Sequence, residues 1–360
     1  MQFAITVDTH VGKWDCIKVA EDLGYDRAWV PDSQIIWSDC YATLALAAVN
    51  TNRIHIGTGV AIPGTRIAPV TAHSIASINQ LAPGRVFLGI GTGHTAMRVM
   101  GQDPMPVKQF REYLRVVRSL LDGKAVDYTY GGNTREIQFL HRDRYYINLD
   151  NRIPIYVAAN GPKALEATGA YGDGWVTIGR DGKEVAQRME HIRTGAKAVG
   201  KQIGSDFHTS VLTAGCVLQP GEKLTSERVV NETGAWVTCE LHFFYEIWLK
   251  EGRNDALIPP HFANVWERYL ERVKNYSLPE HARFRQIHNG HCTFMQPDER
   301  GFVTPEAIRA TCVVGTPDEI VAQLRQMEKD GLKELNLLPA ADHQKEVWKD
   351  FAETIFPAFR

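Results

Sequence analysis

Short apolar runs rich in β-branched residues alternate along this chain with longer segments whose apolar residues recur at helical spacing. The clearest example begins at Arg53 and reads RIHIGTGVAIPGTRIAPVTAHSIASINQLAPGRVFLGIGTGHTAM. Two apolar runs, Ile54–Val60 and Val86–Ile90, flank a segment with helical periodicity, Ala68–Leu81. Both runs are almost continuously hydrophobic, as expected for strands that are buried on both faces. The pattern therefore predicts a strand–helix–strand unit of a parallel sheet.

The same alternation extends over most of the chain. The predicted strands are Gln2–Asp8, Asp26–Val30, Ile54–Val60, Val86–Ile90, Ile153–Ala159, Trp175–Ile178, Ser210–Leu218 and Leu335–Leu338. The predicted helices include Trp14–Leu23, Asp39–Val49, Ala68–Leu81, Phe110–Leu121, Glu184–Val199, Pro317–Gly331 and Val347–Ile355. Strands with intervening helices favour an α/β fold of the (β/α)8 TIM-barrel type. An open Rossmann sheet shares this rhythm, but no Gly-x-Gly-x-x-Gly motif follows the first strand.

Two segments, at about residues 125–149 and 278–301, interrupt the rhythm and are predicted to be insertions. The first is polar and aromatic, which indicates a hairpin or a lid. Residues 225–276, between the two insertions, are rich in helical pattern and aromatic side chains. Because no linker rich in Pro, Gly or Ser divides the chain, we predict a single domain over residues 1–360. Inserted loops build substrate pockets in such barrels, so we expect both insertions to line the substrate site.

The composition is that of an ordinary globular enzyme, with 44% hydrophobic residues, 23% charged residues and a formal net charge of -2. This charge gives no reason to expect nucleic acid or an anionic membrane as a partner. No apolar run approaches the roughly 18 residues of a membrane helix, and the N-terminus lacks the pattern of a signal peptide. The six cysteines show no Cys-x-x-Cys spacing, so we expect reduced thiols in the cytoplasm.

Histidines within the second insertion raise the question of a metal. His288, His291 and Cys292 lie close together in the chain, but no further ligand follows at a spacing typical of zinc sites. The sequence therefore predicts no metal.

Glycines gather where two predicted strands end. Gly57 and Gly59 follow one strand, and Gly91 and Gly93 follow the next. Because ligands bind at the carboxyl edge of parallel strands, these glycines indicate a binding site, although tight turns alone would also require them. A later strand meets the sequence AANGPK, where a helix begins. Backbone N–H groups and the positive dipole end of a helix suit a phosphate, and a plain helix start is the alternative interpretation.

The motifs RIHIGTGV, GRVFLGIGTG, PIYVAANGPKALEATGAYGDGWV and VTPEAIRATCVVGTPDEI resemble the luciferase-like flavin oxidoreductase superfamily. This superfamily includes bacterial luciferase, FMN-dependent monooxygenases, and dehydrogenases and reductases that use coenzyme F420. The pattern is most similar to the branch of the methylene-tetrahydromethanopterin reductases. The likeness covers most of the chain, and is weakest in residues 201–276.

The resemblance implies a cofactor site at the barrel mouth. A cis peptide bond after the third strand, here Gly59–Val60, would prop the flavin ring from behind. The residues implied to bind the cofactor are Gly59, Val60, Ile62, Gly91, Gly93, His94, Ala158, Ala159, Asn160, Gly161 and Thr177.

The resemblance also implies catalytic and substrate-binding positions. Asp32 and Trp37 match an acid and an aromatic residue of the F420-dependent sugar-phosphate dehydrogenases, but Ser33 replaces their catalytic histidine, and His94 replaces a glutamate. Because alcohol oxidation needs a base for the hydroxyl proton, an alcohol dehydrogenase is disfavoured. His94 is the best candidate for acid–base work, and Asp32 and Ser33 are expected to act with it in positioning the reactive intermediate and moving protons.

Trp37 is expected to contact substrate, together with two residues predicted from their place in the chain, His10 and Tyr128. The alternative interpretation of His10 and of His94 is that each only donates a hydrogen bond to a loop carbonyl and has no role in the site.

The leading prediction is an oxygenase that uses reduced FMN and O2 on a small organic substrate, with a separate flavin reductase as partner. The first alternative is hydride transfer with coenzyme F420, without oxygen. The second is a flavin-binding barrel without catalytic activity, because a fold does not fix function. The resemblance also implies a homodimer.

Overall fold

A computed structural model describes residues 1–360. The sequence predicts one domain, and the structure groups the chain into two compact units. The first unit comprises Met1–Leu212 and Gln326–Asn336, and the second comprises Thr213–Arg325 and Leu337–Arg360. No helix is long and apolar enough to cross a membrane.

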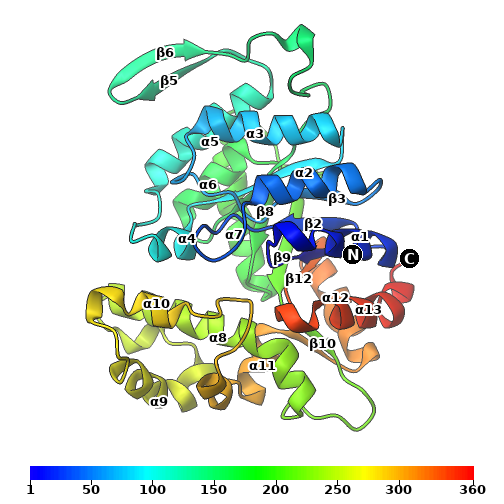
Figure 1. Ribbon diagram of the computed structural model, residues 1–360, viewed down its shortest axis with the longest axis vertical. Coiled ribbons are helices and arrows are strands. Elements are labelled where there is room, and N and C mark those ends of the chain that lie inside the picture. The colour runs from blue at the N-terminus through cyan, green and yellow to red at the C-terminus, as the bar shows by residue number, and fades with distance from the viewer. The chain divides into compact units, whose positions relative to one another are not determined.

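A closed barrel of eight strands forms the first unit, in the order β1-β12-β9-β8-β7-β4-β3-β2 (Figure 1). Its strands are β1 Gln2–Thr6, β2 Arg27–Val30, β3 His55–Thr58, β4 Val86–Gly91, β7 Ile155–Ala158, β8 Gly174–Thr177, β9 His208–Thr213 and β12 Glu334–Leu337. The pairs from β1 to β4, and those that join β4, β7, β8 and β9, are parallel. The predicted (β/α)8 barrel is thereby confirmed.

Helices connect the strands of this barrel, and most of them pack against a neighbouring helix of the chain. They are α1 Asp15–Leu23, α2 Cys40–Asn50, α3 Ala68–Leu81, α4 His94–Val99, α5 Val107–Leu121, α6 Pro162–Tyr171, α7 Gly182–Lys197 and α12 Pro317–Lys329. Local chemistry sets several of their ends. The Asp39 side chain accepts a hydrogen bond from the Ala42 N–H and begins α2, and Gly24 ends α1 in the left-handed conformation (φ 92).

The barrel interior combines aromatic rings with one buried charge. Trp29 packs against Phe87 and Tyr156, with ring centroids 4.5 and 5.8 Å apart. At the amino end of the strands the Glu334 carboxylate accepts hydrogen bonds from Arg27 at 2.8 Å and from the indole of Trp29 at 3.1 Å. This interior forms a floor beneath the carboxyl ends of the strands.

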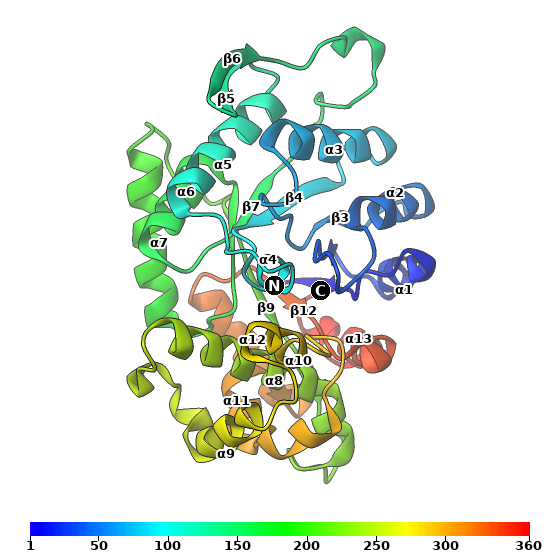
Figure 2. The same cartoon turned by 60° about the vertical axis from the view of Figure 1, so that its left-hand side comes forward.

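The first predicted insertion is a hairpin, as expected, formed by antiparallel β5 (Val126–Tyr130) and β6 (Asn133–Ile137). It projects beyond α3 and α5 in both views (Figures 1 and 2). The insertion lies in the connection from α5 to β7, whereas the mouth of such a barrel is built by loops that run from strand to helix. The topology therefore argues against the expectation that this insertion lines the substrate site.

The second unit is mainly helical. It contains α8 Glu227–Lys250, α9 Ala263–Lys274, α10 Phe284–Ile287, α11 Pro305–Thr311 and α13 Gln344–Thr354. The second insertion, residues 278–301, folds into short helical turns and loops that include α10. Two short strands, β10 Gly215–Val217 and β11 Val313–Gly315, form a separate parallel pair.

The prediction of one strand over Ser210–Leu218 is wrong. Barrel strand β9 ends at Thr213, and the chain then pairs with β11 because the Ala214 carbonyl accepts a hydrogen bond from the Val313 N–H at 3.0 Å. A side chain at Gly215 would collide with the rings and methyl groups of Phe351 and Leu337. The division of the predicted strand into β9 and β10 accompanies this packing. The hydrophobic pattern of the segment does not reveal it.

Candidate functional site

The carboxyl ends of the barrel strands bring together most of the predicted site residues. Gly59 directly follows β3, Gly91 ends β4 and Ala159 directly follows β7. Asp32 lies two residues after β2, and Thr177 ends β8. Because these strands are parallel, their carboxyl ends share one edge of the barrel, which is where ligands bind in this fold.

The loop after β3 is fixed to both neighbouring strands. Its Gly59–Val60 peptide bond is cis, as the resemblance implies. The Gly59 N–H donates to the Val30 carbonyl at 2.8 Å, and the Ala61 N–H donates to the Gly89 carbonyl at 2.8 Å. A side chain on Gly59 would meet Trp29 Cβ at 2.7 Å, so only glycine fits over the aromatic floor.

Asp32 is buried behind this loop, and both its carboxylate oxygens have partners. Oδ2 accepts hydrogen bonds from Arg66 at 2.7 Å and from the Ile62 N–H at 3.3 Å, and Oδ1 accepts from Gln34 at 2.6 Å. Burial raises the pKa of the Asp32 carboxyl, and Arg66 opposes that shift without cancelling it. The carboxylate therefore holds the loop in place, and both of its oxygens already accept hydrogen bonds.

Arg66 is a residue that the sequence analysis missed. It also pairs with Asp39, the residue that caps α2, at 3.1 Å, and its guanidinium lies 4.5 Å from the ring centre of Tyr41. Its carbonyl accepts a hydrogen bond from Tyr113 at 2.7 Å. Arg66 thus joins the β3 loop to helices α2 and α5, and only the fold reveals this because Asp32 is 34 residues away in the chain.

Three strand ends converge around Gly91. A Cβ on Gly91 would lie 3.1 Å from Val60 Cγ2 and 3.3 Å from Ala158 Cβ. Val60 and Ala158 in turn pack on the Trp29–Phe87–Tyr156 cluster. The absence of a side chain at Gly91 leaves an apolar cradle between these residues. An apolar cradle fits the face of a flat aromatic ring, and the flavin ring that the resemblance implies is such a group.

Gly93 and Ile62 complete this side of the edge. Gly93 is left-handed (φ 85), and a side chain there would meet Ile62 Cγ2 at 2.7 Å. His94 follows at the first position of α4 and is exposed. The structure thus brings Gly59, Val60, Ile62, Gly91 and Gly93 together, and His94 is next to them in the chain.

The residues between β7 and α6, at the same edge of the barrel, form an environment that suits a phosphate. Ala159, Asn160 and Gly161 lead into α6, and the space next to Gly161 is open. Arg188 of α7 donates to Thr177 Oγ1 at 3.0 Å and to Asn160 Oδ1 at 3.5 Å. A helix start beside a guanidinium is a favourable environment for an anion. Arg188 is another residue that the sequence analysis missed, since nothing in the pattern of α7 sets it apart.

The remaining predicted residues are placed as follows. Ser33 and Trp37 are half-buried in the turn after β2, where the Trp37 N–H donates to the Ser33 carbonyl at 3.1 Å. His10 is exposed, and its Nδ1 accepts a hydrogen bond from the Gly12 N–H at 3.0 Å. That bond gives His10 a local role in capping the turn after β1.

Tyr128 is the one predicted residue that the structure does not bring to this edge. It lies on the hairpin and stacks on Tyr130, with ring centroids 6.2 Å apart, and the neighbouring Asp127 carbonyl accepts a hydrogen bond from Arg115 of α5. The hairpin packs against the outside of the helix layer, so its position argues against a contact between Tyr128 and substrate.

Several curated proteins with functional names are similar to this chain. The chain is 37% identical over 186 residues to 5,10-methylenetetrahydromethanopterin reductase of Methanolobus tindarius, a match that covers 51% of this chain and 55% of that protein. It is 28% identical over 331 residues to the protein of the same name from Archaeoglobus fulgidus, with coverage of 89% and 86%. It is 33% identical over 198 residues to F420-dependent hydroxymycolic acid dehydrogenase of Mycobacterium tuberculosis, with coverage of 51% and 53%. The matched region thus spans about half the length of two of these three relatives.

Solved structures share the fold. The coenzyme F420-dependent tetrahydromethanopterin reductase from Methanopyrus kandleri superposes with a TM-score of 0.70 at 20% identity, covering 100% of this chain and 99% of that one. The oxygenating constituent of 3,6-diketocamphane monooxygenase from Pseudomonas putida superposes with a TM-score of 0.62 at 16% identity, covering 99% and 98%. A family model described as luciferase-like monooxygenase matches residues 13–334, which take in all the strand ends that form the site. The chain belongs to the luciferase-like monooxygenase family.

Proposed function

We propose that this protein is an oxidoreductase that uses coenzyme F420 to reduce a small organic substrate at the carboxyl edge of the barrel. Support for the cofactor comes from the curated relatives, one of which is named for its dependence on F420. Support for the direction of reaction comes from Asp32, whose carboxylate oxygens are all bonded to Arg66, Gln34 and the Ile62 N–H. This bonding carries the proposal, because an alcohol dehydrogenase needs a free base near the hydroxyl group.

The chain's own residues would bind and orient the reactants. Reduced F420, when bound, supplies a hydride. Gly91, Val60 and Ala158 offer an apolar cradle for its ring, and Arg188 with the start of α6 offers a place for the phosphate of its tail. Hydride transfer to an already electrophilic carbon, such as that of an iminium ion or an activated alkene, requires at most one further proton. His94, exposed at the mouth, is the residue proposed to supply it.

A second candidate function is oxygenation with reduced FMN and O2. The description of the matching family model favours it, because that model covers most of the chain. The same cradle and phosphate environment fit FMN. The two functions differ in their need for oxygen and for a separate flavin reductase.

Turnover under controlled atmosphere tests the proposal. The protein is mixed anaerobically with reduced F420 and a panel of imines and activated alkenes, and the oxidised cofactor is followed by absorbance. We expect oxidation that depends on one class of substrate and proceeds without O2. Turnover only with reduced FMN and O2 would overturn the F420 proposal in favour of oxygenation.

A matched pair of variants tests His94. His94→Ala should slow turnover, whereas His73→Ala, at an exposed histidine on α3, should leave both turnover and cofactor affinity unchanged. Unchanged turnover in His94→Ala would remove this residue from the proposed mechanism.

A further inference from the structure

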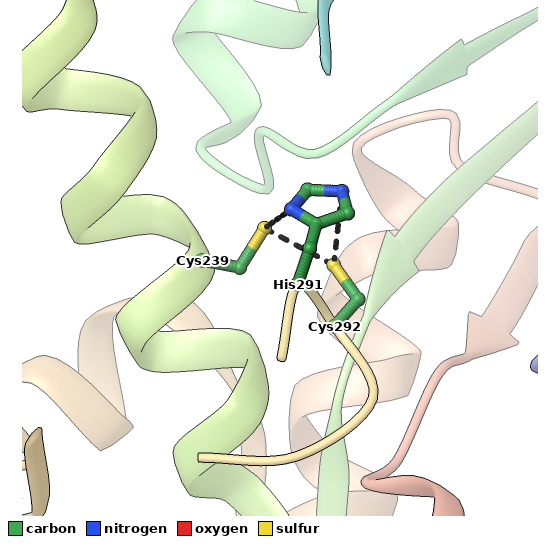
Figure 3. A group of neighbouring side chains, drawn as sticks. All are labelled: Cys239, His291 and Cys292. Atoms are coloured by element: carbon green, nitrogen blue, oxygen red, sulfur yellow. Dashed lines mark hydrogen bonds between the residues drawn. The ribbon is translucent and has the colours of Figure 1, made fainter. Parts of the chain in front are cut away.

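Three side chains with metal-binding atoms meet in the second unit. Cys239 lies on α8, and His291 and Cys292 lie in the loop after α10 (Figure 3). The two Sγ atoms are 3.0 Å apart, and Cys239 Sγ is 3.3 Å from His291 Nδ1. Cys292 Sγ is 3.8 Å from His291 Nε2. All three ligand atoms lie within 4.8 Å of one another.

Two polar pairs on the same face of α8 fix the loop that carries His291 and Cys292. His242, three residues after Cys239, is bonded to Glu299 at 2.6 Å. Glu246, seven residues after Cys239, is bonded to His288 at 2.7 Å. Spacings of three and seven residues put these side chains on one helix face. The loop is therefore held against α8 on the side where Cys239 projects.

The loop backbone also directs two consecutive side chains toward the helix. Cys292 is left-handed (φ 52), and both His291 and Cys292 face Cys239 (Figure 3). Cys292 is buried, whereas Cys239 and His291 are half-buried. An ion could thus reach the group from solvent and be held by ligands that are already close together.

We propose that Cys239, His291 and Cys292 bind a soft divalent metal ion, of which Zn²⁺ fits best. Thiolate sulfur and imidazole nitrogen are the ligands that Zn²⁺ prefers, at about 2.3 and 2.0–2.1 Å, whereas Mg²⁺ and Ca²⁺ prefer oxygen. Two thiolates neutralise the charge of the ion, and their two protons are released to solvent on binding. Tetrahedral geometry at these bond lengths separates the sulfurs by about 3.7 Å, so they would move apart by less than about 1 Å.

Two nearby acid–imidazole pairs bond internally, Glu246 to His288 and His242 to Glu299, and we assign no fourth protein ligand. Three protein ligands and one open position, filled by water, are typical of catalytic zinc sites. His288 supports this interpretation because its side chain is only 4% exposed and its Nδ1 has no hydrogen-bond partner. Its ring centre lies 5.7 Å from that of His291. A metal-bound water is the kind of donor that this nitrogen lacks.

Metal titration of the reduced, full-length protein tests the site, with Co²⁺ as a spectroscopic probe and Zn²⁺ as its competitor. We expect one Co²⁺ per chain, with thiolate-to-metal charge-transfer bands that Zn²⁺ abolishes. Cys239→Ser and Cys292→Ser should each weaken binding by more than about 100-fold, and His288→Asn by about 10–100-fold, the usual effect of losing a group that orients a ligand. Cys16→Ser, at a half-buried cysteine of α1, is the matched control and should bind like the wild type.

A measurement on the wild type avoids any variant that fails to fold. Zn²⁺ should protect Cys239 and Cys292 from an alkylating reagent, and should leave the labelling of Cys16 unchanged, as read by peptide mass spectrometry. The proposal is overturned if no stoichiometric metal binds, or if the Cys239→Ser and Cys292→Ser variants bind as well as the wild type. It is equally overturned if the two thiols are lost to a disulfide while the reduced protein shows no affinity for metal.

Discussion

Two buried carboxylates lie at opposite ends of the same barrel, and their surroundings differ. Glu334 is fully buried at the amino end, where Arg27, Trp29 and Ser210 donate hydrogen bonds to it. Asp32 is 2% exposed at the carboxyl edge, where Arg66, Gln34 and one backbone N–H donate. Burial raises the pKa of both groups, but His208 and Arg27 reverse this for Glu334 and lower its pKa to about 2, whereas the pKa of Asp32 stays raised.

This difference distinguishes a carboxylate that stabilises the fold from a carboxylate that lies at the candidate site. At the amino end, a full set of donors and cations compensates Glu334, so its negative charge stabilises the barrel. At the carboxyl edge, compensation of Asp32 is incomplete, so the loop after β3 carries an electrostatic cost at neutral pH. A buried charge that is not fully compensated is expected beside a functional site, whereas the rest of a fold compensates its buried charges.

The largest expected effect is the loss of unfolding free energy caused by Glu334→Gln. The substitution leaves Arg27 without its buried counter-charge, and breaking a buried ion pair in this way costs about 3–5 kcal/mol of unfolding free energy. Urea denaturation at neutral pH measures this. The control is Glu190→Gln, which removes an exposed partner of Arg193 and should change stability by less than about 0.5 kcal/mol. A similar small change in Glu334→Gln would contradict a structural role.

The second-largest expected effect is the loss of cofactor affinity caused by Arg188→Ala. Loss of a guanidinium next to α6 should weaken binding of FMN or F420 by about 10- to 100-fold, the usual range for a hydrogen bond to a charged group. Riboflavin, which lacks the phosphate, should bind the variant and the wild type equally. Fluorescence titration provides both affinities, and Arg193→Ala on the same helix is the control. Equal losses for FMN and riboflavin would show that Arg188 does not contact the phosphate.

Asp32→Asn is expected to lower the unfolding free energy by less than Glu334→Gln does, and the two losses should depend on pH in opposite directions. A raised pKa means that Asp32 stabilises the fold most at low pH, and that this contribution is lost as the pH rises through its folded pKa. The penalty of Asp32→Asn should therefore shrink as pH rises. Glu334 has a lowered pKa, so the penalty of Glu334→Gln should shrink as pH falls from about 5 to about 2. Denaturation curves across this range measure both slopes, and slopes of equal sign would contradict the comparison.

The smallest effect is expected from Tyr128→Ala. The hairpin lies outside the helix layer, so cofactor affinity and turnover should change by less than about twofold, as for other surface substitutions. A larger loss of turnover would restore the predicted contact between this residue and substrate.

The fold could be predicted from the sequence because its strands are buried on both faces and therefore stand out as continuous apolar runs. The glycines at the ends of β3 and β4 could be predicted for the same reason, since they follow those runs directly. The partners of Asp32 could not be predicted, because Arg66 and Gln34 are ordinary polar residues until the barrel closes.

Contacts between distant segments account for the other differences. The break after β9 depends on pairing with β11, about 100 residues later in the chain. Cys239 lies 53 residues before Cys292, so no ligand spacing in the sequence could connect them. Such contacts depend on tertiary packing and leave no local pattern.

The central claim is that the carboxyl edge of the barrel binds F420 in the cradle at Gly91. An anaerobic fluorescence titration of the wild type and of Gly91→Val, with F420 and with FMN, tests it most directly. The account predicts one F420 per chain, bound at least about 10-fold more tightly than FMN, and loss of this binding in a Gly91→Val variant that keeps its circular dichroism spectrum. Failure of the wild type to bind F420, or undiminished binding by a folded Gly91→Val variant, would contradict it.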